Sequence, residues 1–305
     1  MKVGIKFGAF DWRERLEKSN AKYAEVYFRL DWKEKYQELF QYLRENEIHF
    51  GLHFWALVKS KYMPNLAYCR EGIDEETEKL IKESLDIASN AGAYYVNFHP
   101  GSLRNLELDL NKQEISLADS EKISEKEAFA SLEKHMRKLK SHADQCGVKV
   151  FVETVPIFDP SNFREGDKQL GRQNPIKSFH LSNKYLIELG QKGYDICCDV
   201  AHAAAQYPNE SRGNVFKKMF SDIQQLAPYV KLVHVNTTLE PLNGTDSHNG
   251  VMEDDFQQNV FPSREQYLKI FGVFKKYPDI WYIPEPQMEK MVDNYFEIQK
   301  LLDEA

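Results

Sequence analysis

The stretch "AGAYYVNFHPGS", residues 91–102, contains the structural unit that recurs along the whole chain. A glycine ends a helical pattern, and an apolar run rich in aromatic and β-branched residues then predicts a buried strand, Tyr94–His99. A histidine, a proline and a glycine end that strand. Further strand-like runs are Val3–Phe7, Ala24–Phe28, His49–His53, Val148–Glu153, Tyr194–Asp199, Val230–Asn236 and Ile280–Glu285.

Helical patterns alternate with these runs. They cover Asp11–Ser19 (the weakest), Trp32–Asn46, Asp74–Ala91, Glu125–Gln145, Ser178–Gly190, Gly213–Leu226, Ser263–Tyr277 and Met288–Leu302. This alternation favours the α/β class and a parallel (β/α)8 TIM barrel. A doubly wound open sheet would alternate similarly, but no GxGxxG motif follows the first strand to favour it. Without a linker or a break in composition, residues 1–305 are expected to form one domain.

The composition limits the class of protein. Of 305 residues, 42% are hydrophobic, which is enough for a sizeable core. The net charge of −7 argues mildly against a general nucleic-acid coat protein, but not against one local basic groove. No apolar run could span a membrane, and the four cysteines show no CxxC pairing. Adjacent Cys197 and Cys198 would point to opposite faces of a strand as buried thiols. We expect a cytoplasmic protein with no membrane contact.

Polar residues that can bind metal gather at the carboxyl ends of the predicted strands and in the loops after them. They are His53, His99, Glu153, Asp199, His202, His234, Asp246, His248 and Glu285. All these ends would lie on one face of a parallel barrel, where barrel enzymes place their chemistry.

Each of these residues also has an ordinary structural explanation. Asp199 could cap the following helix, and Glu153 or Glu285 could pair with a lysine or arginine. Four carboxylates in one barrel mouth would nevertheless repel each other unless cations lay among them. Imidazole and carboxylate ligands suit zinc, manganese or iron, and nine ligands exceed the needs of one ion. Two or three ions are therefore expected.

The ordered motifs "HFW", "FHPGS", "VET", "DVAH", "VHVN", "DSH" and "PEP" resemble those of the endonuclease IV family of apurinic/apyrimidinic endonucleases, which belongs to the xylose-isomerase-like barrel superfamily. The resemblance implies a trinuclear Zn²⁺ site, with Mn²⁺ or Fe²⁺ as alternatives. By this resemblance His53, His99 and Glu153 would hold the first ion, and Glu153 would bridge to a second. Asp199, His234 and Glu285 would complete the second site, and His202, Asp246 and His248 would hold the third ion.

The resemblance also implies a reaction, the hydrolysis of a phosphodiester, with abasic sites in damaged DNA as one candidate substrate. Glu153 and Glu285 would orient the attacking water. The alternative is a sugar or sugar-phosphate isomerase or epimerase that holds one Mn, Co or Mg ion on Glu153, Asp199, His234 and Glu285. That alternative leaves His53, His99, Asp246 and His248 without a role and ranks second. A non-catalytic binding barrel ranks far below, and protein partners stay open.

The chain departs from endonuclease IV in segments that contact DNA. Ser247 in "DSH" stands where that family has an arginine, and the first strand, "VGIKFGAF", lacks the family's histidine. Substrate contacts are instead expected from a tyrosine and a basic loop: Tyr62, Arg164, Lys168 and Arg172. The alternative explanation is an ordinary solvated surface. Four further histidines are expected to be structural or surface residues: His49, His135, His142 and His180.

Overall fold

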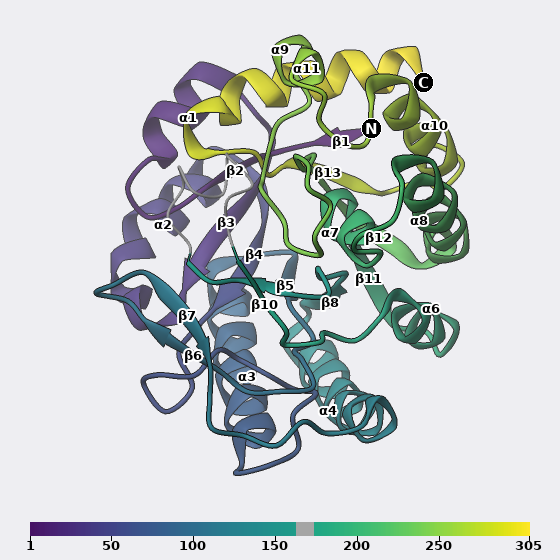
Figure 1. Ribbon diagram of the computed structural model, residues 1–305. Helices are drawn as coiled ribbons and strands as arrows, with labels where there is room; N and C mark the ends of the chain where they lie inside the picture. Colours follow the sequence, from purple (N-terminus) through teal and green to yellow (C-terminus); the bar gives the residue numbers. More distant parts are fainter. Residues whose placement is uncertain (163–173) are drawn as a thin grey trace.

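Eight parallel strands follow one another around a barrel in the order of the sequence, and helices cover its outer side (Figure 1). The computed structural model describes residues 1–162 and 174–305. The strands are β2 (Ile5–Phe7), β3 (Tyr23–Arg29), β4 (His49–Trp55), β5 (Tyr95–Phe98), β8 (Lys149–Glu153), β11 (Asp195–Asp199), β12 (Val230–Val235) and β13 (Trp281–Pro284). Neighbours pair in parallel throughout. The predicted single-domain TIM barrel is confirmed.

The barrel closes through the first predicted strand, which Gly4 divides into β1 (Lys2–Val3) and β2. β1 pairs with β13, whereas β2 pairs with β3. A Cβ atom at Gly4 would lie 2.8 Å from the carbonyl oxygen of Tyr23 and 2.7 Å from the side chain of Ile283. Glycine therefore lets both neighbouring strands approach, and one extended segment joins the two ends of the sheet.

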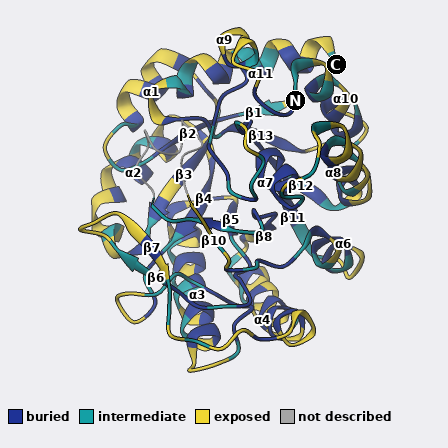
Figure 2. Ribbon diagram, viewed as in Figure 1, coloured by how far each residue is buried: buried dark blue, intermediate teal, exposed yellow. Residues whose placement is uncertain are grey.

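The helices bury one side against the barrel and expose the other (Figure 2). They are α1 (Trp12–Ser19), α2 (Gln37–Glu45), α3 (Ile73–Ala91), α4 (Glu125–Cys146), α6 (Asn183–Gln191), α7 (Val200–Ala205), α8 (Arg212–Leu226), α9 (Glu253–Gln257), α10 (Arg264–Phe274) and α11 (Met291–Glu304). Short 3-10 helices cover η1 (Leu30–Tyr36), η2 (Ala227–Tyr229) and η3 (Met288–Lys290). In the described part of the chain, no helix is both long and apolar enough to cross a membrane.

The segments that differ from the sequence prediction include η1, the start of α6 and a hairpin. The first turns of the predicted helix Trp32–Asn46 belong to η1. The helix predicted from Ser178 begins only at Asn183, because the preceding residues bond to another loop: His180 donates its N–H to Ile157 O (3.0 Å). The sequence analysis also missed a hairpin after β5, formed by β6 (Leu106–Asp109) and β7 (Glu114–Leu117).

Two separate apolar cores hold the barrel together. The larger fills the space between sheet and helices, and the smaller fills the lumen with Tyr95, Phe151, Cys197, Leu232, Trp281 and Ile283. Cys197 belongs to the lumen and Cys198 to the outer core, which confirms their predicted opposite directions. Gly51 makes room for the ring of Tyr95, since a Cβ there would lie 2.2 Å from it. The lumen is thus a packed floor on which a site can stand.

Candidate metal centre

The predicted ligands lie directly above the lumen residues on the same strands. Glu153 follows Phe151 by two positions, Asp199 follows Cys197, His234 follows Leu232, and Glu285 follows Ile283. Because side chains two residues apart on a strand share a face, the strands carry these groups from the apolar floor into the barrel mouth. Glu153, Asp199 and His234 are fully buried.

Four of the groups converge closely enough to share one cation. His234 Nδ1 lies 2.7 Å from Glu285 Oε2, 3.2 Å from Glu153 Oε1 and 4.0 Å from Asp199 Oδ2. We call Glu153, Asp199, His234 and Glu285 the strand quartet.

A second group of three ligands lies beside the quartet. His202 Nε2 and His248 Nε2 lie 3.5 and 3.0 Å from Asp246 Oδ2. We call His202, Asp246 and His248 the loop triad, because two of its members come from the loop after β12. Glu153 Oε1 is 3.3 Å from His202 Nδ1 and so connects the triad to the quartet.

The remaining two predicted ligands stand on the other side of Glu153. His99 Nε2 is 3.5 Å from Glu153 Oε1, and His53 Nε2 is 3.8 Å from Glu153 Oε2. The structure therefore brings all nine predicted residues to one place, with Glu153 at its centre.

Unsatisfied buried atoms show that these residues fit a metal. Within the described residues, no hydrogen bond reaches His99 Nε2, Asp246 Oδ2 or Glu285 Oε2, although imidazole nitrogens lie within ion-pair distance of each carboxylate oxygen. Buried polar atoms are rarely left without a partner, and these three belong to residue types that bind zinc, manganese or iron. Divalent metal binding is what this donor set suits, while the sequence-based assignment of each ligand stays a prediction.

Burial in this centre disfavours the charged form of a carboxyl group. The neighbouring groups determine whether the pKa of each carboxyl is raised or lowered. Burial alone would raise the pKa of Glu153, but the imidazoles of His234, His99 and His53 hold that pKa well below its ordinary value. Burial raises the pKa of Asp199 to about 7, and nearby Asp246 and Glu285 add to the effect. Burial also lowers the pKa of His99, which favours the neutral imidazole that binds metals. The centre carries negative charge that a cation would relieve.

Asp199 caps a helix, as considered for it, and its carboxylate also lies within the strand quartet. Its Oδ1 accepts the backbone N–H of His202 (2.7 Å) and caps α7, while its Oδ2 accepts from Asn236 Nδ2 (2.8 Å). The cap fixes the carboxylate toward the barrel axis and places His202 one helical turn beyond it.

Sequence reasoning missed two charged residues inside the barrel, Lys6 and Glu25. Lys6 Nζ lies 2.6 Å from Glu285 Oε1 and 2.9 Å from Glu25 Oε1, and Glu25 Oε1 lies 2.9 Å from His234 Nε2. Both occupy inward positions of β2 and β3, where Lys6 is paired with Glu25 in register. A lone charge within an otherwise apolar strand was the signal that could have identified them.

Apolar and aromatic side chains narrow the entrance to the centre. A cavity of about 330 Å³ opens above it, and its walls include Tyr27, Trp55, Leu108, Leu110 and Ile115. The last three come from the β6–β7 hairpin, which is therefore a wall of the site.

Polar groups also reach this cavity. Arg29 lines it, with its guanidinium carbon 4.3 Å above the ring of Trp55. His180, predicted to be structural, lines it too and pairs with Asp159 (Nε2 to Oδ2, 2.6 Å). Both residues belong to the loop after β8, from which substrate contacts were expected at Arg164, Lys168 and Arg172, but neither of the two was assigned to the site.

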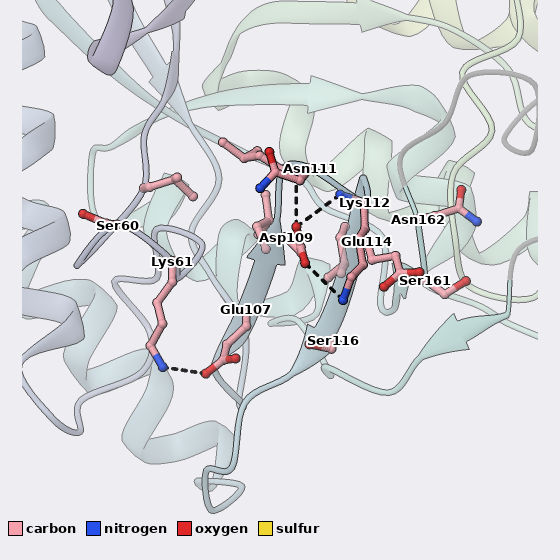
Figure 3. A pocket seen from close by; sticks show the side chains of 14 residues that line it. Ser60, Lys61, Glu107, Asp109, Asn111, Lys112, Glu114, Ser116, Ser161 and Asn162 are labelled. Carbon is pink, nitrogen blue, oxygen red and sulfur yellow. Dashed lines mark hydrogen bonds and ion pairs between the residues drawn. The ribbon is translucent and has the colours of Figure 1, made fainter.

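The predicted substrate-binding residues are placed differently. Tyr62 forms backbone bridges with Val58 and Glu107 beside the hairpin and does not line the cavity. Arg164, Lys168 and Arg172 lie outside the described residues, so their role stays a prediction. On the other side of the hairpin is a broad hollow of about 890 Å³, shown in Figure 3, where Lys61 pairs with Glu107 (2.9 Å) and Lys112 with Asp109 (3.4 Å). Among the described residues that line this hollow, charges of both signs are mixed and do not form a basic groove.

Ser247 has a structural role within the loop. Its buried hydroxyl accepts the N–H of Leu239 (2.9 Å) and donates to Asn249 Oδ1 (2.6 Å). It therefore holds the loop that carries Asp246 and His248, and it offers no positive charge to a phosphate.

A parallel barrel with acidic and imidazole groups in its mouth defines the protein as an α/β barrel with a candidate metal centre. The sequence model of the xylose isomerase-like TIM barrel family matches residues 10–256, and the chain belongs to that family. A comparison with curated protein sequences gives no match.

Solved structures of low identity share the fold. They include D-psicose 3-epimerase with D-tagatose from Clostridium cellulolyticum (12% identity, TM-score 0.60, covering 100% of this chain and 95% of that one). They also include endonuclease IV from Thermus thermophilus (14%, TM-score 0.55, 100% of both chains). A third is a Thermus thermophilus protein soaked with ZnCl2 (18%, TM-score 0.60, 100% and 99%). These similarities show the fold alone.

Proposed function

We propose that the protein is a metal-dependent epimerase or isomerase that acts on a sugar or a substrate of similar size. The carrying observation is the strand quartet: Glu285 lines a cavity of about 330 Å³ with a partly apolar wall, and the other three members are buried next to it within ion-pair distance. This volume lies at the small end of the range for small-molecule sites.

The acid–base groups that this reaction needs are present. Glu153 and Glu285 both approach His234 Nδ1, at 3.2 and 2.7 Å, and so flank one position. A bound metal ion would polarise the substrate carbonyl and lower the pKa of the adjacent C–H. One ionised carboxylate would remove the proton from that carbon, and the other, entering the reaction as the protonated carboxylic acid, would give its proton to the opposite face.

The comparisons support this reading better than the phosphodiesterase suggested by the sequence motifs. Several similar structures are sugar epimerases, including D-psicose 3-epimerase and L-ribulose 3-epimerase, although an endonuclease IV is also similar. The wall formed by the β6–β7 hairpin is apolar and Ser247 carries no positive charge, so neither suits a long anionic substrate. Both features therefore favour the epimerase or isomerase.

Phosphodiester hydrolysis is the second candidate, and one observation favours it. The loop triad offers ligands for an ion that a single-metal epimerase does not require. Two neighbouring ions can stabilise the attacking and leaving oxygens of a phosphoryl group.

One panel separates the two functions. Protein reconstituted with Mn²⁺, Co²⁺, Mg²⁺ or Zn²⁺ is incubated in D2O with ketoses, and proton NMR follows deuterium incorporation at carbon. The same samples are tested on a duplex that contains a tetrahydrofuran abasic analogue. We expect exchange with at least one ketose and loss of that exchange in Glu285→Gln, with Glu17→Gln as an exposed control. Duplex cleavage without any carbon exchange would overturn the proposal.

A further inference from the structure

In the expected trinuclear site, the only cations are metal ions. The structure instead places the buried ammonium of Lys6 among the same residues. Its Nζ contacts His53 Nδ1 (2.6 Å), Glu285 Oε1 (2.6 Å) and Glu25 Oε1 (2.9 Å). One imidazole nitrogen and two carboxylate oxygens are themselves a typical metal ligand set. Three partners also match the three N–H groups of an ammonium, so this cation is fully satisfied.

Each imidazole ring has a second nitrogen that does not face the metal position. The partner of this second nitrogen distinguishes histidines that can bind metal from those that cannot. A histidine that binds metal through one nitrogen normally donates the N–H of its other nitrogen to an oxygen acceptor. His234 Nε2 faces Glu25 Oε1 (2.9 Å), His202 Nδ1 faces Thr154 O (2.8 Å), and His248 Nδ1 faces Glu285 O (3.2 Å). These three rings can therefore direct a lone pair at a metal.

His53 does not follow this pattern, because its Nδ1 atom contacts a hydrogen-bond donor instead of an acceptor. Lys6 can only donate to His53 Nδ1, so the proton of the neutral imidazole must reside on Nε2. That is the nitrogen that faces Glu153, at 3.8 Å. A protonated nitrogen has no lone pair for a metal, so this tautomer removes His53 from the group His53, His99 and Glu153, whose ligand atoms lie close enough together to share an ion, and leaves two ligands there.

We infer that Lys6 is a fixed internal cation that takes the place of one metal ion, so that the centre binds two divalent ions rather than three. One ion belongs to the strand quartet and the other to the loop triad. His53 is hydrogen-bonded to Lys6 and is not a ligand. This inference corrects the trinuclear expectation and goes beyond the proposed function, since it concerns metal content whichever substrate is used.

Charge balance supports two ions. Five carboxylates surround the centre: Glu25, Glu153, Asp199, Asp246 and Glu285. Lys6 offsets one of their five negative charges, and two divalent ions offset the other four. A buried centre of this kind is then neutral, which is the state that burial favours. Glu285 can serve both partners, with Oε1 on Lys6 and Oε2 toward His234.

Metal stoichiometry tests the inference directly. Apoprotein is dialysed against excess Zn²⁺ and then against buffer, and bound metal per chain is measured by mass spectrometry. We expect the wild type to saturate at two ions, and Lys6→Met, which keeps an unbranched side chain one atom shorter and removes its charge, to bind a third. Lys22→Met removes an exposed lysine and should match the wild type.

A second variant keeps the test decisive if Lys6→Met does not fold, which circular dichroism would reveal. His53→Gln should still bind two ions, whereas His234→Gln should lose one. Wild-type saturation at one or three ions, loss of an ion in His53→Gln, or a folded Lys6→Met that stays at two would overturn the inference. No substrate is involved, so failure of the ketose panel leaves this result untouched.

Discussion

Glu25→Gln is the substitution that best tests how the metal centre is supported. Glu25 is fully buried, receives the hydroxyl of Tyr95 on Oε2 (2.9 Å), and contacts both Lys6 and His234 through Oε1. Burial alone would raise the pKa of Glu25, but His234 and Lys6 hold it well below its ordinary value. Glutamine keeps the shape and removes the charge that fixes the ring of His234.

Two effects of different size should follow. A carboxylate that accepts the free N–H of a metal-binding histidine typically contributes a factor of about 10 to 100 in metal affinity, equivalent to roughly 1.4–2.8 kcal/mol. Leaving Lys6 with one carboxylate fewer should also cost the apoprotein about 3 kcal/mol of folding free energy, at the low end for a broken buried pair.

A competition titration against a chromophoric chelator measures the affinity, and urea unfolding of the metal-free protein measures the stability. Glu17→Gln is the matched control, because it neutralises an exposed glutamate on α1. If Glu25→Gln binds metal within twofold of the wild type and unfolds at the same urea concentration, the assigned role of Glu25 is wrong.

Three further predictions concern catalysis, packing and pH. Glu153→Gln should lower the rate of carbon exchange at least about 100-fold with an unchanged circular dichroism spectrum, because an acid–base group is lost; wild-type turnover would contradict its role. Gly51→Ala should destabilise the fold by about 3 kcal/mol in urea unfolding, since its Cβ would lie 2.2 Å from the ring of Tyr95; a smaller loss than about 1 kcal/mol would show that the ring can move. Burial alone would raise the pKa of Glu78, but hydrogen bonds from Lys82, Lys138 and His135 lower it to about 2. Its stabilisation is thus complete above about 4.5 and disappears as pH falls toward about 2, so the difference in urea midpoint between wild type and Glu78→Gln should shrink between pH 6 and pH 3.

The barrel and the ligand positions could be predicted from sequence because both depend on short-range patterns. A strand with side chains of period two fixes which residues face inward, so His234 and Glu285 could be placed without coordinates. Glycines such as Gly92, with a positive φ of 81°, marked the helix ends that precede strands.

The parts that could not be predicted depend on contacts between distant strands. The tautomer of His53 is set by Lys6, which lies 47 positions earlier, and no local pattern contains that information. The hairpin after β5 was also missed, since its strands of four residues are too short for a clear period. The residues that gather in the barrel mouth followed from the sequence, whereas their protonation and the shape of the entrance did not.

The ion pair between Lys6 and Glu285 spans 279 positions of sequence, and the contact between Glu25 and His234 spans 209. Contacts of such separation form late, since the intervening chain must first be ordered. During synthesis the early strands leave the ribosome long before β13, so the nascent barrel lacks one carboxylate of the quartet. Metal loading should therefore be among the last events of maturation, and a bound ion would indicate that the barrel has closed.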